Sequence, residues 1–359
     1  MKKIILILSC VLMAGCDSRD DYRAYVLPEK VESKIEALNA ENQLPDLTRE
    51  PRAKKVDDTD KTLQEYVKNS ELRIVNDNFR IRVPQELVKK YDAGGYKAKL
   101  GFLHAGIIDE LVTIFDGFFD NKPIFYTYII PEDMKTKYAG HPIQGFEDDG
   151  FSMAYGTWPD GEAWVDDISV RTNIMLEYAD VIQENFNASK HDLFRYGFAD
   201  VVPLYILDYE SKYPEYAQRV AETEIYSVND LLTKPYEEDV PDEKCFFQKS
   251  SISAYVLVRT LLEKMQEKFG ITKEEAAKLY LNIYAMSPET NQDKLGPRSE
   301  EDPEWLDARV QDSLVLMQVF AKLLDLDADK LIYTTEYQQE VLQEIAKASK
   351  VETTNNESK

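Results

Sequence analysis

The residue types that perform most protein chemistry are scarce in this chain. It holds three histidines, His104, His141 and His191, among 359 residues. No two of them stand three to five positions apart, so no helix presents a histidine pair to a metal ion. Neither a Gly-x-Ser-x-Gly elbow nor a phosphate-binding loop occurs. We therefore expect no metal and no cofactor. His104 lies in an apolar helical stretch, which favours a hydrogen-bonded core histidine.

Two tryptophans are candidates for binding a ligand by aromatic stacking. Trp158 and Trp164 flank a Pro-Asp-Gly turn in a predicted hairpin over residues 151–170. Aromatic rings of this kind stack on peptide or sugar ligands, and they also pack strands together. We expect packing to be the commoner role. Trp158, Trp164 and His191 are kept as candidates for the lining of a ligand cleft.

The first sixteen residues predict where in the cell the protein is located. Lys2 and Lys3 precede a short apolar run that ends in Met13-Ala14-Gly15-Cys16, which is the pattern of a secretory signal. Its last four residues resemble a bacterial lipobox, in which lipid is attached to the cysteine and the chain is cut just before it. The resemblance implies a signal peptide over 1–15 and a lipid anchor on Cys16. It places the protein in the bacterial cell envelope, on the periplasmic side in a Gram-negative organism.

The net charge and the hydrophobic content of the chain exclude some classes of binding partner. The formal net charge is -23 at pH 7, and 43% of the residues are hydrophobic. That hydrophobic content suits a folded protein and excludes a polytopic membrane protein. The excess of acidic residues argues against nucleic acid as a partner, because nucleic-acid binding requires a basic surface. The remaining expected partners are the membrane, through the lipid, and an envelope peptide or protein.

Patterning along the chain predicts an α+β fold. A flexible tether is expected over 16–67, a mixed and β-rich lobe over 68–200, a mainly helical lobe over 201–349 and a disordered tail over 350–359. Within the tether, residues 31–38 are compatible with one short helix. In the first lobe, alternating runs predict strands at residues 72–75, 79–83 and 123–130, and residues 100–119 suit a helix. In the second lobe, helix stop and capping signals stand at Gly270, at Thr272 with Glu275, at Pro303, and at Ser227 with Asp230.

The order of these elements over residues 68–285 resembles a gluzincin, the thermolysin-like or peptidase-MA-like group of metallopeptidases. That group has a mixed lobe with an edge strand, a helix carrying His-Glu-x-x-His, a second helix with a zinc-binding glutamate, and a helical lobe. Here a hairpin leads into residues 173–182, and residues 196–200, Tyr-Gly-Phe-Ala-Asp, resemble the Glu-Gly-Phe-Ala-Asp of the second helix. Residues 250–270 resemble the helix that follows.

The zinc-binding residues that define the gluzincins are missing from this chain. In this alignment Glu177 takes the place of the general base, Leu176 and Asp180 replace the two histidines, and Tyr196 replaces the zinc-binding glutamate. A catalytic zinc needs three protein ligands and an open position for water. Leucine cannot ligate a metal and tyrosine is a poor ligand at neutral pH. The resemblance therefore implies a degenerate, non-catalytic peptidase fold whose cleft binds a peptide or protein partner or serves as a scaffold.

Alternatives remain open. An active hydrolase would need a divergent carboxylate or metal site around Glu177, with Asp180, His191 and Asp200 as its other members. A third interpretation is an unrelated α+β or mostly helical envelope domain with no strand beside residues 171–185. The simplest interpretation of the motif region is structural: Met175, Leu176, Ala179 and Ile182 form the buried face of a helix, and Gly197 is a packing glycine.

Overall fold

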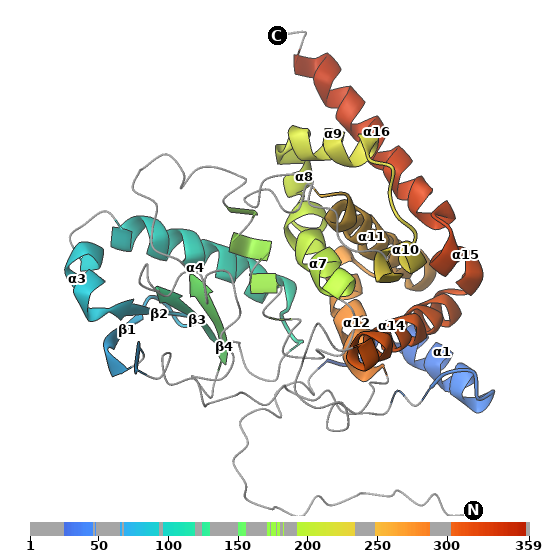
Figure 1. Cartoon of the computed structure of the whole chain (residues 1–359), viewed down its shortest axis with the longest axis horizontal. Helices are drawn as coiled ribbons and strands as arrows, with labels where there is room; N and C mark the ends of the chain where they lie inside the picture. The colour runs from blue at the N-terminus through green and yellow to red at the C-terminus, as the bar shows by residue number, and fades with distance from the viewer. Residues whose placement is uncertain are drawn as a thin grey trace, which may run out of the picture.

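A computed structural model describes residues 25–45, 47, 65–66, 68–92, 96–118, 124–129, 150–155, 171–172, 174–176, 178–179, 182, 192–233, 248–287 and 303–356. Figure 1 shows a small sheet with its helices beside a larger, wholly helical part. We call these parts the mixed lobe and the helical lobe. The expected α+β class, with a mixed lobe followed by a mainly helical one, is confirmed at this level.

The mixed lobe is built on a four-stranded sheet in the order β1-β2-β3-β4. Its strands are β1 (Ser70–Ile74), β2 (Phe79–Pro84), β3 (Ile124–Ile129) and β4 (Gly150–Tyr155). β1 and β2 are antiparallel, whereas β2 pairs with β3, and β3 with β4, in parallel. A parallel pair needs a long crossover connection, and α3 (Gln85–Asp92) with α4 (Tyr96–Ile114) provides it between β2 and β3.

Alternation along β2 decides which face of the sheet is covered. Phe79, Ile81 and Val83 are fully buried, while Arg80 and Arg82 between them are only half-buried. The ring of Phe79 stacks on that of His104 in α4, with centroids 5.9 Å apart. The apolar side of the sheet therefore packs on α4, which contributes the fully buried Ile107.

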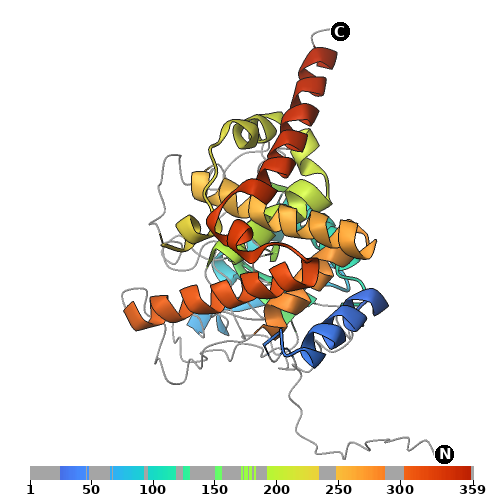
Figure 2. The same ribbon diagram turned by 90° about the vertical axis from the view of Figure 1, so that its right-hand side faces the viewer.

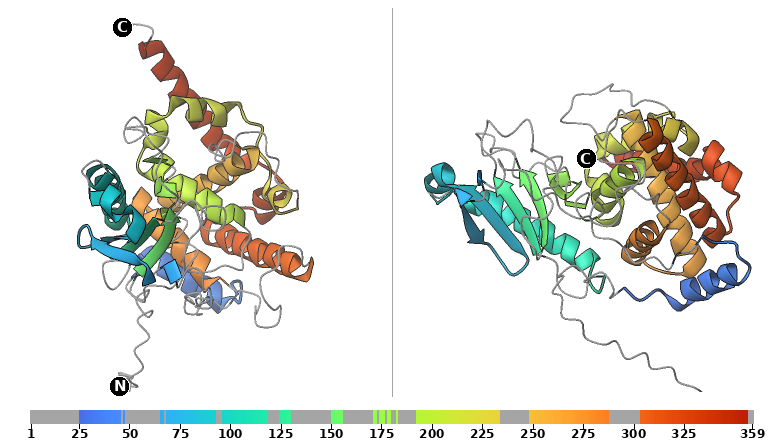
Figure 3. Two further views of the ribbon diagram at one scale, coloured as in Figure 1. Left: turned by 60° about the vertical axis from the view of Figure 1, so that its left-hand side comes forward. Right: turned by 60° about the horizontal axis from the view of Figure 1, so that its bottom comes forward.

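The helical lobe surrounds α11, whose buried residues run along almost its whole length. Its elements are α7 (Asp192–Val201), the π-helix η3 (Val202–Ile206), α8 (Tyr209–Lys212), α9 (Pro214–Glu222), α10 (Val228–Thr233), α11 (Lys249–Phe269), α12 (Lys273–Met286), α14 (Pro303–Leu324), α15 (Ala328–Tyr333) and α16 (Glu336–Asn356). Figure 3 shows this bundle next to the sheet and α4. Helices α7, α12, α14 and α16 all contact α11.

The predicted helix punctuation is confirmed. α11 ends at Gly270, which has a left-handed φ of 70° that glycine adopts without strain. At the start of α12, Thr272 and Glu275 each accept a hydrogen bond from the other's backbone N–H, at 3.2 and 2.9 Å, and so form a capping box. Ser227 likewise accepts a hydrogen bond from the backbone of Asp230 at 3.2 Å.

Two expected boundaries differ from the structure. The limit between lobes at residue 200 falls inside a continuous helical run, because α7 passes directly into η3. α7 packs on α11 and so belongs to the helical lobe. The tail expected over 350–359 is helical as far as Asn356. No proline or glycine occurs between Glu336 and Asn356 to end that helix earlier.

The expected tether over 16–67 also needs correction. Its residues 29–40 form α1 (Glu29–Ala40), which lies against α14 (Figure 2). Val31 is fully buried, and Leu38 and Leu47 are 6% and 2% exposed. Burial of this apolar stripe attaches a segment that its polar composition had suggested would be free.

Among the residues that the structure describes, no helix is both long and apolar enough to cross a membrane.

Candidate functional site

The structure describes only part of the predicted site. Tyr196 and Asp200 lie in α7, and Leu176 lies in the helical segment before it. The other predicted site residues fall outside the described residues: Cys16, Trp158, Trp164, Glu177, Asp180 and His191. Of the four residues of the alternative carboxylate site, Asp200 alone belongs to the described part of the chain.

Around Leu176, the helical segment presents a buried apolar face. Met175, Ala179 and Ile182 are fully buried, and Leu176 is partly buried against the same core. The structural interpretation of this segment is confirmed for these residues. Leu176, which the resemblance to gluzincins sets against the first histidine, is thus a core-packing hydrocarbon side chain.

A buried polar cluster fastens this segment to the mixed lobe. The hydroxyl of Tyr178 lies 2.7 Å from Nδ1 of His104 in α4 and makes a short hydrogen bond with Oγ1 of Thr127 in β3. The ring of Tyr178 also meets that of Phe125 edge-on, with centroids 5.7 Å apart. A strand therefore does lie beside the segment, contrary to the expectation from an unrelated fold.

His104 is the hydrogen-bonded core histidine that the sequence predicts. It is fully buried, and this burial lowers the pKa of its imidazole to about 3. The ring is therefore neutral at physiological pH. It is held between the stacked Phe79 and the hydroxyl of Tyr178, which leaves it a structural role.

Tyr196 occupies the position of the third zinc ligand in the alignment. Its neighbour Arg195 places its guanidinium 4.9 Å from the centre of the Tyr196 ring and donates a hydrogen bond of 3.1 Å from Nη2 to the phenol oxygen. The phenol thus stabilises a cation that belongs to the protein itself. A guanidinium at this oxygen repels a second positive ion, so the local charge opposes binding of a divalent metal.

Gly197 permits a close contact between α7 and α11. A Cβ at Gly197 would lie 2.4 Å from the carbonyl oxygen of Ala254 and 2.7 Å from Cγ2 of Val258. No side chain fits in this space. The resemblance to a Glu-Gly-Phe-Ala sequence thus corresponds here to a packing glycine, as the structural interpretation predicted.

Asp200 lies inside the helical lobe and is 2% exposed. Among the groups that its charge affects is the phenol of Tyr216 in α9, which is fully buried. Burial raises the pKa of the Tyr216 phenol well above its ordinary value, and the negative charge of Asp200 raises it further. The structure therefore places the Asp200 carboxylate in the interior, within electrostatic range of the Tyr216 phenol.

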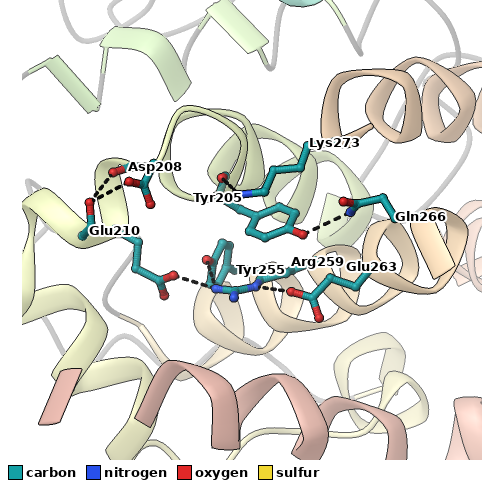
Figure 4. A network of polar contacts seen from close by, with 9 residues as sticks. Tyr205, Asp208, Glu210, Tyr255, Arg259, Glu263, Gln266 and Lys273 are labelled. Atoms are coloured by element: carbon teal, nitrogen blue, oxygen red, sulfur yellow. Dashed lines mark hydrogen bonds and ion pairs between the residues drawn. The ribbon is translucent and has the colours of Figure 1, made fainter. Parts of the chain in front are cut away.

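Close to this pair lies a charged network that sequence reasoning missed (Figure 4). Arg259 of α11 bonds to Glu210 of α8 through Nη1 at 2.6 Å and to Glu263 through Nε at 2.8 Å. Its Nη1 also donates to the hydroxyl of Tyr255 at 3.1 Å. The guanidinium carbon stands 4.5 Å from the centre of the Tyr205 ring. The spacing of Arg259 and Glu263, four apart on a helix, was the one readable signal.

The charged groups of this network are largely shielded from solvent. Burial raises the pKa values of Glu210 and Glu263, and the positive charge of Arg259 opposes that rise. The side chains of Arg259 and Glu210 are 10% and 16% exposed. Lys273 adds a second cation 4.2 Å from the Tyr205 ring and donates to the Tyr205 carbonyl at 3.2 Å. This arrangement holds α8, η3, α11 and α12 together.

A second polar cluster connects the two lobes. Arg171, just before Leu176 in sequence, donates from Nη2 to Oε1 of Glu110 in α4 at 2.7 Å and from Nε to the hydroxyl of Tyr209 in α8 at 2.5 Å. The hydroxyl of Tyr209 in turn donates to Oε2 of Glu110 at 2.8 Å. We call these three residues the interlobe triad. Its members are separated by up to 99 positions, so no local pattern could reveal it.

Within the described part of the chain, no three His, Cys, Asp or Glu side chains gather in a way that could hold a metal ion. What the arrangement provides is structural: a neutral histidine, an arginine-centred network and a triad across the lobes. Comparison with known proteins gives no family model, no curated protein and no solved structure that matches this chain.

Proposed function

We propose that this chain is a non-catalytic lipoprotein of the bacterial cell envelope. Lipid on Cys16 anchors it to the membrane, and its folded part is a degenerate gluzincin-like body that binds a peptide or protein partner or acts as a scaffold. The order of a mixed sheet, a helical segment against that sheet and a helical lobe supports the resemblance.

The contact between Arg195 and Tyr196 carries the non-catalytic part of the proposal. Where a gluzincin has a zinc-binding carboxylate, this chain has a phenol paired with its own cation at 3.1 Å. Leu176 adds an apolar side chain at the position of another ligand. Without a metal, the pKa of a water molecule is not lowered toward about 7, and Glu177 has no activated water to deprotonate.

The sheet supplies the surface best suited to a peptide. In the described sheet, β4 pairs with β3 and ends the strand order. A strand at the end of a sheet offers main-chain groups to an extended peptide, which binds by adding a further strand. This is the binding mode that the edge strand of a peptidase-like cleft would retain after loss of the metal.

Zinc uptake and peptide cleavage test the loss of catalysis. The mature protein is exposed to zinc, and bound metal is measured by mass spectrometry beside cleavage of a fluorogenic peptide library. The matched control is Glu177→Gln. We expect no stoichiometric zinc and the same background cleavage in both proteins. Stoichiometric zinc with cleavage that disappears in Glu177→Gln would establish the active hydrolase instead.

Peptide selection tests the binding role. Extended peptides are selected from a random library on the purified protein, and the tightest are resynthesised with alternate backbone nitrogens methylated. Methylation removes the N–H donors that strand addition needs. We expect saturable binding that methylation abolishes. Selection of no peptide, or peptides insensitive to methylation, would contradict binding at the edge of the sheet.

A further inference from the structure

We propose that residues 25–40, which include α1, act as a clamp that holds the folded body close to the membrane in one orientation, with the end formed by Tyr25, Val26 and the turn that follows α4 facing the lipid surface. This inference rests on the lipid anchor of the proposed function. It adds the face of the molecule that meets the membrane and the contacts that select it.

The clamp begins at Tyr25, nine positions after Cys16. The Tyr25 ring packs against that of Phe118, with centroids 5.4 Å apart, and its hydroxyl donates to the carbonyl of Glu275 at 3.5 Å. Burial raises the pKa of this phenol. Tyr25, the first described residue after Cys16, thus contacts both the turn that follows α4 and the first turn of α12.

Charged contacts continue the clamp along α1. Lys34 forms an ion pair with Asp325 at 2.6 Å, and Lys268 of α11 pairs with the same carboxylate. Lys30 donates to the carbonyl of Phe269 at 3.4 Å, at the end of α11. With Val31 fully buried between these lysines, α1 has both an apolar and an ionic attachment to the helical lobe.

The attachment shortens the link to the membrane. Only residues 17–24 separate the lipidated cysteine from the clamp, whereas a tether reaching residue 67 would leave about fifty. At about 3.3–3.6 Å per extended residue, the short link reaches at most about 30 Å. Its root-mean-square length as a flexible chain is about 16 Å. The clamped end of the body must therefore stay near the bilayer.

The exposed surface at this end suits a lipid boundary. Tyr25 and Leu27 pack against the core, and Val26 between them is 83% exposed. Val26 is among the few large apolar side chains that the described surface exposes. Figures 1 and 2, which share a vertical axis, place α1 low and the end of α16 high. The proposed orientation therefore directs α9 and the end of α16 away from the membrane.

Energy transfer from the protein to acceptor lipids measures this orientation. The lipidated protein, in a Cys245→Ser background, is placed in lipid nanodiscs with one dye at Asp116→Cys or Lys347→Cys. Both side chains are exposed; Asp116 lies in the turn that ends at Phe118, and Lys347 lies in α16. We expect about twofold higher transfer from position 116, because the link confines that end to within about 30 Å of the bilayer.

Releasing the clamp provides the decisive comparison. Val31→Asp places a charge at a fully buried position of α1, and Ser33→Asp places the same charge at an exposed one. Val31→Asp should reduce transfer from position 116 to the level of position 347, while Ser33→Asp should not. Unchanged circular dichroism of the helical lobe shows that the body remains folded; if Val31→Asp unfolds it, Lys34→Glu replaces it.

The outcomes separate the two proposals. Mass spectrometry of the mature protein first reports whether Cys16 carries lipid, and a protein without lipid would refute the anchor itself. A lipidated protein that shows equal transfer from both positions, or the same transfer with and without the clamp, would overturn the orientation while leaving the anchor intact.

Discussion

Gly197 and Ala254 approach so closely that a methyl group at Gly197 would stand 2.4 Å from the carbonyl oxygen of Ala254. This contact determines the distance between α7 and α11, and therefore where Tyr196 and Asp200 lie. The same glycine belongs to the stretch that resembles the zinc-binding helix of a gluzincin. Its role in this protein is to let two backbones meet.

We predict that Gly197→Ala destabilises the protein by at least about 1–3 kcal/mol, the usual cost of overpacking a core, because backbone atoms must move. Urea unfolding measures the change. Gly106→Ala in α4 is the matched control. Its Cβ would meet only guanidinium nitrogens of Arg171, at an ordinary 3.9 Å. That variant should be neutral or more stable by up to about 1 kcal/mol. Equal losses in both variants would refute the close contact.

We predict that Arg259→Met costs up to about 3–5 kcal/mol, because it leaves Glu210 and Glu263, whose side chains are only 16% and 21% exposed, without their cation. Lys264→Met is the control on the same helix. Lys264 also bonds two glutamates, but these are 68% and 63% exposed, so its loss should cost less than about 1 kcal/mol. Chemical denaturation at neutral pH compares them. A small effect of Arg259→Met would mean that the network contributes little to stability.

We predict that the titration of His104 makes the free energy of unfolding depend on pH. Its pKa is about 3 in the folded protein and near 6.5 when unfolded, so the unfolded chain takes up the proton first. The stability that depends on the neutral ring is complete above about pH 6.5 and decreases as the pH falls toward 3. The loss is about 1.4 kcal/mol per pH unit within that window.

His104→Gln removes this titration. Its free energy of unfolding should be lower than that of the wild type at pH 7, through weakened contacts, and should fall less steeply below about pH 6.5. Urea midpoints at several pH values provide the test. Parallel pH curves for the two proteins would show that His104 does not titrate differently on folding.

The interlobe triad should couple α4 to α8. Tyr209→Phe removes one hydroxyl that bonds both Glu110 and Arg171, and we expect a loss of about 1–2 kcal/mol. Arg171 and Glu110 are 25% and 36% exposed, so their ion pair contributes less than a buried one. In a double-mutant cycle, Tyr209→Phe and Arg171→Met should cost less together than the sum of the separate losses. Additive effects would contradict coupling through the triad.

Much of the architecture was predictable because its signals are local. Strands at residues 72–75 and 79–83, the stop at Gly270, the capping box at Thr272 and the helix beginning at Pro303 all follow from neighbouring residues. His104 was also predictable, since an apolar helical stretch favours a buried histidine. Attachment of α1 was not, because its polar composition conceals two buried positions, Val31 and Leu38.

The candidate site was less predictable than the fold. The sequence alone established that histidine is scarce and that Met13-Ala14-Gly15-Cys16 resembles a lipobox, and it suggested the resemblance that sets Leu176 and Tyr196 against metal ligands. Only the tertiary structure decided that Arg195 pairs with Tyr196, that Asp200 lies near Tyr216, and that Arg171 joins Glu110 to Tyr209. The physical reason is distance along the chain. Composition and periodicity report each residue's immediate neighbours, whereas a buried charge finds its partner only when separate elements pack together.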